Sequence, residues 1–109
     1  MDTIGSFKLT NQGGFVCAGK VQYIDPNGYP KTSDRWHYIN ITESEVMNPS
    51  EKAVPNSALV MMYIDIVAGN DRTGGTYFLY DPSSNRRAEY SITGTTLNSG
   101  VHFDGIRTP

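Results

Sequence analysis

The sequence predicts an all-β protein, an antiparallel β-sandwich of about 7–8 strands of the Ig-like or lectin-like kind, with a small barrel as the alternative. Three observations predict this class. Apolar and polar residues alternate with a period of two in several segments, and no long segment has the helical period. Turn signals separate these segments, and the composition of 11 Gly, 6 Pro and 7 Tyr in 109 residues favours turns and strands. We expect one domain, residues 1–109, because this length provides one hydrophobic core.

Three strands are expected in the first half of the chain. Residues 6–10 alternate between apolar and polar side chains, and residues 15–24 have apolar side chains mainly at odd positions. Residues 36–42 are aromatic and β-branched, although their pattern leaves open which face is buried. The two prolines between positions 48 and 57 predict a loop, and residues 48–51 can begin one short helical turn.

The second half of the chain is expected to supply the centre of a sheet and a hairpin. Residues 58–68 are apolar at both odd and even positions, which predicts a central strand covered on both faces. A polar loop is expected at 69–75, a strand at 76–80 and a turn at 81–85. Alternation returns at 88–93 and at 101–106, and residues 98–100 are predicted to form the turn between these two strands.

Charge and hydropathy argue against two classes of partner. The formal net charge is −2 and the basic residues are scattered, so nucleic acid is not expected as a partner. No membrane span is expected, because the longest apolar run is much shorter than the roughly 18 residues that cross a bilayer. A single cysteine and no recognisable signal segment favour the cytosol, or release without a signal peptide; a removed signal stays an alternative.

The titratable residues do not form a catalytic or metal-binding pattern, so we expect no enzyme activity and no cofactor. His37 and His102 stand far apart in the sequence, without a cysteine pair beside them. Cys17 lies at an odd position of its predicted strand, as the apolar residues around it do, and is expected to be a buried, inert thiol. Oxygen donors near Asn70 and Asp71 could serve calcium, but the same residues are ordinary in turns.

A polar and aromatic segment at residues 29–38 is the first candidate ligand site. Aromatic rings stack on the C–H faces of sugars while polar side chains bond their hydroxyls, so Asp34, Arg35, Trp36 and Tyr38 fit a shallow glycan site. The alternative is that Trp36, the only tryptophan, anchors the core with one edge in contact with water.

The polar loop at 69–75 is the second candidate ligand site. Asn70, Asp71 and Arg72 combine hydrogen-bond donors and acceptors that could recognise a sugar. The alternative is a solvated hairpin loop without a ligand.

Four segments resemble small β-sandwich proteins of the lectin or haemagglutinin type and of the haemolysin-like type: residues 13–16, 21–23, 64–71 and 90–97. The resemblance implies a sandwich fold and transfers no catalytic or sugar-binding signature to any position. Our first hypothesis is a carbohydrate-binding module that acts multivalently as a homodimer or tetramer. The main alternative is a protein- or membrane-interaction module of a toxin or defence system, and a small enzyme is the third.

Overall fold

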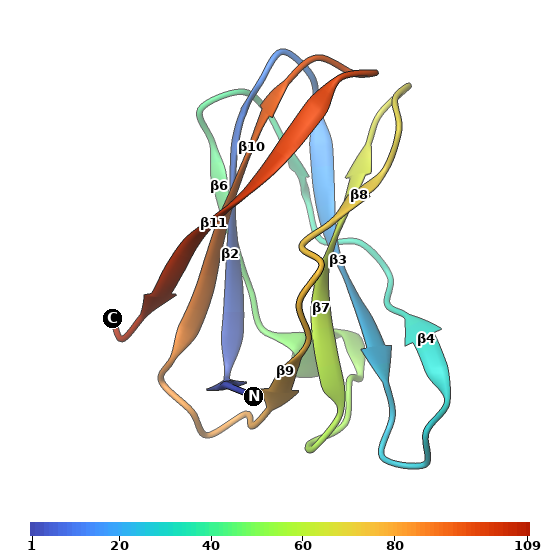
Figure 1. Ribbon diagram of the computed structural model, residues 1–109, viewed down its shortest axis with the longest axis vertical. Coiled ribbons are helices and arrows are strands. Elements are labelled where there is room, and N and C mark those ends of the chain that lie inside the picture. The colour runs from blue at the N-terminus through green and yellow to red at the C-terminus, as the bar shows by residue number, and fades with distance from the viewer.

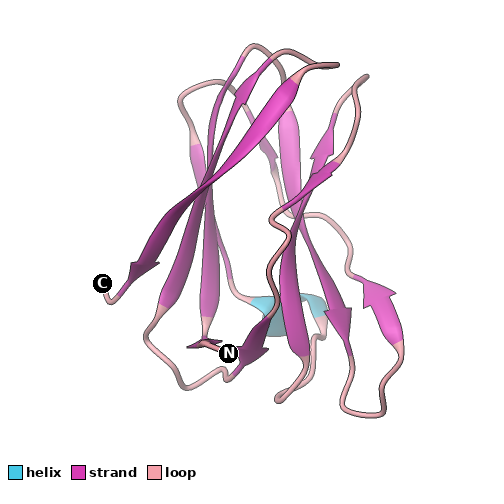
Figure 2. Cartoon of the chain, in the orientation of Figure 1, coloured by secondary structure: helices cyan, strands magenta, loops and turns pink.

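Two β-sheets pack face to face in the computed structural model, which describes residues 1–109 (Figure 1). The predicted all-β sandwich is confirmed, and the single helical turn lies beside the sheets at one end (Figure 2). That turn, Pro49–Lys52, is the one expected near position 48, and it is far too short to cross a membrane. Each sheet keeps two open edges, which excludes the alternative of a closed barrel.

The first sheet, sheet A, has the strand order β1-β9-β7-β3-β4, with β5 also paired to β3 and β8 to β7. Its strands are β1 (Thr3–Ile4), β3 (Cys17–Ile24), β4 (Pro30–Thr32), β5 (Tyr38–Ile39), β7 (Leu59–Ile66), β8 (Arg72–Thr73) and β9 (Phe78–Tyr80). The second sheet, sheet B, has the order β11-β10-β2-β6. Its strands are β2 (Ser6–Gly13), β6 (Ser44–Met47), β10 (Arg87–Gly94) and β11 (Ser99–Arg107).

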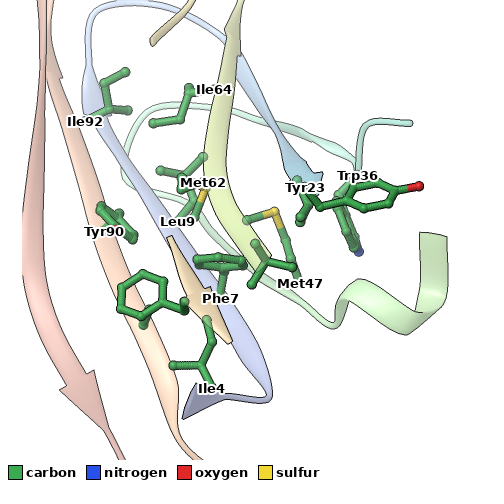
Figure 3. Packing of buried hydrophobic residues seen from close by; sticks show 14 of the residues in the cluster. Ile4, Phe7, Leu9, Tyr23, Trp36, Met47, Met62, Ile64, Tyr90 and Ile92 are labelled. Atoms are coloured by element: carbon green, nitrogen blue, oxygen red, sulfur yellow. The ribbon is translucent and has the colours of Figure 1, made fainter. Parts of the chain in front are cut away.

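The core lies between the two sheets and is built from the alternate side chains of each strand (Figure 3). Phe7 of β2 is fully buried, and its ring centroid lies 6.0 Å from that of Phe78 and 6.3 Å from that of Tyr90. Burial raises the pKa of Tyr90 to about 12. Cys17 is also fully buried, as the sequence predicted, and burial raises its pKa to about 11, so the thiol stays protonated.

The pairing of the strands differs from the prediction in two ways. The sheets are mixed and not purely antiparallel, because β2 pairs with β10 in parallel over eight residues and β1 pairs with β9 in parallel. The structure has eleven strands, more than expected, because the sequence did not predict β1, β4, β6 and β8, which are two to four residues long. Parallel pairs join segments far apart in the sequence, and such short strands carry no periodic signal.

Three expected elements are corrected by the structure. In the 36–42 segment only Tyr38–Ile39 is a strand, and the neighbouring residues lie in loops. The strand at 58–68 is central, but no layer covers its outer face, where Tyr63 and Asp65 are partly exposed. The last hairpin turns at residues 95–98, earlier than predicted, since Ser99 already belongs to β11.

Candidate functional site: the loop end of the sandwich

Four loops meet at one end of the sandwich, and we call residues 13–16, 40–43, 67–71 and 94–98 the loop end. The strand register places them together, because Gly13 is paired with Gly94 at the end of the parallel β2–β10 ladder. In sheet A the pair Cys17 and Ile66 marks the same end of β3 and β7. The loops gather at the top of Figure 1.

A buried asparagine organises two of these loops. Asn11 is fully buried, and its side-chain amide donates to the carbonyl oxygen of Phe15 at 2.7 Å and to that of Ile39 at 3.0 Å. Its side-chain oxygen accepts from the backbone N–H of Gly13 at 2.9 Å. A buried amide with all of these bonds made fixes the backbone around it, because leaving any partner unpaired in the interior is costly.

Backbone hydrogen bonds tie the other loops to one another. The Val67 N–H donates to the carbonyl oxygen of Val16 at 3.0 Å, and the Asn70 N–H donates to that of Thr96 at 3.1 Å. Gly69 lies so close to the 94–98 loop that a Cβ atom on it would be 2.3 Å from the Thr96 carbonyl oxygen. The loop end is therefore a packed unit with little room for side chains between its loops.

Three apolar side chains stand exposed on three different loops of this unit. The exposed fractions are 54% for Ile41, 45% for Val67 and 61% for Leu97. The loop end contains no lysine or arginine, and its two acidic residues, Glu43 and Asp71, accept hydrogen bonds from backbone N–H groups. The loop end therefore presents isolated apolar contacts in a setting of small polar groups.

The first predicted ligand site lies on the edge of sheet A, where Tyr38 pairs with Ala18 of β3 just before the loop end begins. Trp36 is only 6% exposed, its indole N–H donates to Glu51 at 3.1 Å, and the Lys52 ammonium lies 5.4 Å from its ring centre. The ring is part of the core, as Figure 3 shows, and is not available for a sugar to stack on. The core interpretation of Trp36 therefore holds in this structure.

The other residues of that site are exposed. Tyr38 is 52% exposed, and the guanidinium of Arg35 lies 3.9 Å from its ring centre, so one face of the ring is already covered. Asp34 is exposed beside them. No observation tests a ligand role for Asp34, Arg35 or Tyr38, which stays a prediction.

The second predicted site is divided between two surfaces. The Asp71 carboxylate accepts from the Tyr63 hydroxyl at 2.5 Å on the outer face of sheet A, and this bond raises the pKa of Tyr63 to about 12. The Arg72 side chain points toward sheet B instead, and its Nε donates to the Ser99 hydroxyl of β11 at 2.9 Å. Asn70 lies in the loop end through its backbone bond to Thr96. A ligand role for these three residues likewise stays a prediction.

The histidines do not meet each other. His37 Nδ1 lies 2.9 Å from the Glu45 carboxylate, but this pair is on the surface and no pocket surrounds it. His102 Nε2 lies 3.0 Å from the Thr93 hydroxyl. No three His, Cys, Asp or Glu side chains come together in a group that could hold a metal ion.

The exposed apolar residues of the loop end could not be recognised from the sequence. Each one is a single apolar residue in a turn, which is normal on protein surfaces and draws no attention alone. Leu97 carried the strongest signal, because it is the only large apolar residue within the polar stretch 93–100. Asn11 was missed because an asparagine next to Gly13 and Gly14 is typical of an exposed turn.

Several solved structures have a domain with this fold. A Gram-negative toxin matches with a TM-score of 0.52 and 18% identity over 92% of this chain and 22% of the toxin. Pneumolysin matches with a TM-score of 0.52 and 15% identity over 96% of this chain and 24% of the toxin. The cytotoxin suilysin from Streptococcus suis gives the same four values.

These matches establish a similarity of fold. This chain spans less than a quarter of the length of each of the three toxins. No protein-family model matches it, and no curated protein sequence does. The resemblance to haemolysin-like sandwiches is thus confirmed at the level of the fold, whereas its lectin or haemagglutinin part is not. The chain has the fold of a domain that occurs in bacterial toxins.

Proposed function

We propose that this domain is the surface-binding module of a toxin-type protein and that its loop end contacts the lipid of a membrane. The observation that carries the proposal is the exposure of Ile41, Val67 and Leu97 on one packed end of the sandwich. An end that is held by its own hydrogen bonds loses little conformational freedom when its apolar side chains enter a lipid interface.

The size of the apolar contact predicts weak binding by one copy. Transfer of the exposed parts of these three side chains into lipid contributes on the order of 5 kcal/mol. That free energy corresponds to a dissociation constant of roughly 0.1 to 1 mM. A toxin-type module of this kind gains useful affinity when several copies act on one surface.

The charges of the loop end also favour an apolar mode of contact. Its loops contain no lysine or arginine that could attract anionic headgroups. Binding that depends on apolar burial weakens little with salt, whereas binding through basic residues is screened at a Debye length of about 8 Å in physiological salt. The toxin neighbours support the same proposal, since suilysin is described as a cytotoxin.

Co-sedimentation with vesicles tests the proposal. The vesicles are made of phosphatidylcholine alone, with an anionic lipid, and with a sterol. We expect the triple variant Ile41→Ser, Val67→Ser, Leu97→Ser to bind at least about tenfold more weakly than the wild type. The matched control is Val46→Ser, Leu79→Ser, which removes exposed apolar side chains from the outer faces of the two sheets.

The two variants decide between the loop end and the rest of the surface. Equal binding by the wild type and the control, with loss in the triple variant, supports the proposal. Absence of binding to all three kinds of vesicle, or equal loss in both variants, contradicts it.

Glycan binding is the second candidate function. One structure of pneumolysin that matches this chain, with a TM-score of 0.50 and 20% identity over 92% of this chain and 23% of the toxin, is described as a sugar binding protein. In this chain Tyr38, stacked with Arg35, is the exposed aromatic residue of the predicted site.

A glycan array probed with the wild type, Tyr38→Ala and Tyr29→Ala tests this function. We expect any glycan signal to fall at least about tenfold in Tyr38→Ala. Tyr29, which is also exposed and begins the same segment, is the matched control because it is not among the four residues predicted to contact the sugar. An empty array, or a signal that Tyr38→Ala leaves unchanged, would remove the glycan candidate.

A further inference from the structure

Strand β11 forms an open edge of sheet B. It has nine residues and pairs only with β10, so the backbone groups on its other side have no strand partner, while β8 of sheet A lies close to it. Its regular part is short, because the register shifts after the pair Tyr90 and Phe103, where Asp104 is the extra residue of a β-bulge. Residues 99–103 are therefore the regular open segment, which we call the 99–103 edge.

The hairpin fixes which backbone groups of this edge are free. Thr95 and Asn98 exchange both of their backbone hydrogen bonds, each at 3.2 Å, so they are a hydrogen-bonded pair of the antiparallel ladder. Hydrogen-bonded and non-hydrogen-bonded pairs alternate from there. The N–H and C=O groups of Ser99, Val101 and Phe103 therefore point away from β10, and no other backbone segment binds them.

Phe103 is an exposed aromatic residue on this edge. Its ring lies on the inner side of sheet B, 5.2 Å from the Tyr90 ring centre and 6.2 Å from that of Phe78, yet 53% of the residue is exposed. Val101 on the same side packs against the core and is only partly buried. A free backbone edge and a half-exposed ring thus coincide.

We propose that the 99–103 edge pairs antiparallel with the same segment of a second copy of this chain, on a two-fold axis at Val101. Identical edges can pair in this way because the contact is isologous, and the free groups of Ser99, Val101 and Phe103 lie opposite one another. In this register Phe103 faces Ser99 of the other copy, and His102 faces Gly100. Each large side chain meets a small one.

Electrostatics also favours this partner. The Arg72 guanidinium is held at Ser99 by its Nε hydrogen bond of 2.9 Å. In the proposed register the Phe103 ring of one copy lies next to that Ser99 of the other copy, within reach of its Arg72. The two-fold axis creates this contact twice, and an arginine on an aromatic face is attractive.

The proposed contact joins two copies and does not continue to a third. The bulge at Asp104 limits the pairing to a short segment and twists the remaining edge away. Since the two copies run antiparallel, their loop ends lie at opposite ends of the dimer.

Sedimentation velocity over a concentration series, without lipid, tests the dimer. We expect the wild type to shift from the monomer toward twice its mass as the concentration rises. Val101→Pro removes an N–H that points away from β10 and replaces a partly buried side chain, and it should weaken the dimer at least about tenfold. Val101→Thr is the matched control, because it keeps the N–H and a β-branched side chain.

Two further variants keep the test decisive if Val101→Pro does not fold. Arg72→Gln and Phe103→Ala each remove one side of the proposed ring contact, and each should weaken the dimer several-fold. A wild type that stays monomeric at every concentration overturns the inference. So does a dimer that is equally stable in all four variants, since it must then use another surface. Neither outcome depends on lipid binding, so the proposed function is tested separately.

Discussion

Phe7→Ala is expected to lower the free energy of unfolding by about 4 kcal/mol, the cost of deleting a fully buried aromatic ring. The ring touches both sheets, with Phe78 on one and Tyr90 on the other, so the cavity would open between the two layers. A domain of this size is stable by only about 5–15 kcal/mol. Urea denaturation followed by circular dichroism measures the loss.

Phe103→Ala is the matched control for that measurement. It deletes the same side chain from a residue that is 53% exposed, and we expect a loss of less than about 1.5 kcal/mol at a concentration where the chain is monomeric. Similar losses in the two variants would contradict the assignment of Phe7 to the centre of the core.

Asn11→Asp is expected to destabilise the chain by about 3 kcal/mol or more and Asn11→Ala by about 2 kcal/mol, as judged by urea denaturation. The alanine variant leaves the carbonyl oxygens of Phe15 and Ile39 without their donor. The aspartate variant places a negative carboxylate against the same two oxygens in the interior, so it should be the worse of the two.

Thr10→Ala is the control for Asn11, because it lies next to it on β2. The Thr10 hydroxyl lies 2.9 Å from that of Ser44 on the exposed face of sheet B, and its removal should change the stability by less than about 0.5 kcal/mol. Asn11→Asp as stable as Thr10→Ala would show that the loop end does not depend on this amide.

The long strands could be predicted from the sequence, because one face of each is buried and the other is wet. Residues 6–10, 15–24, 88–93 and 101–106 all fall within or overlap strands of the structure. The 58–68 segment was harder to interpret, since Met61 is buried on the outer face although no second layer covers it. The pattern of apolar residues indicates which side chains are buried, whatever buries them, but it does not indicate how many layers of structure the fold has.

The pairing of the strands could not be predicted in the same way. The parallel pair β2 and β10 joins residues about eighty positions apart in the chain, and each strand has the same local pattern it would have in an antiparallel pair. Strand β6 was missed because Glu45 interrupts a short segment of four residues. Trp36 was ambiguous because its neighbours are polar, and only tertiary packing decides that the ring points inward.

The candidate site was the least predictable part of the molecule. Ile41, Val67 and Leu97 are separated by up to 56 positions in the sequence and come to the same end only through the register of both sheets. The polar residues that the sequence singled out lie instead on the edge of sheet A or are divided between two surfaces, as with Asp71 and Arg72. A set of single exposed residues becomes a site only when the fold assembles it.

An environment-sensitive fluorophore on the loop end tests the central claim most directly. Leu97→Cys can be labelled selectively with a maleimide dye, because Cys17 is fully buried and its raised pKa of about 11 keeps the thiol protonated. Leu79→Cys carries the same dye at the opposite end of the sandwich. On addition of the vesicles that bind the wild type, we predict a blue shift and a rise in emission for the dye at position 97 and no change for the dye at position 79. A change at position 79 with none at position 97 would contradict the account.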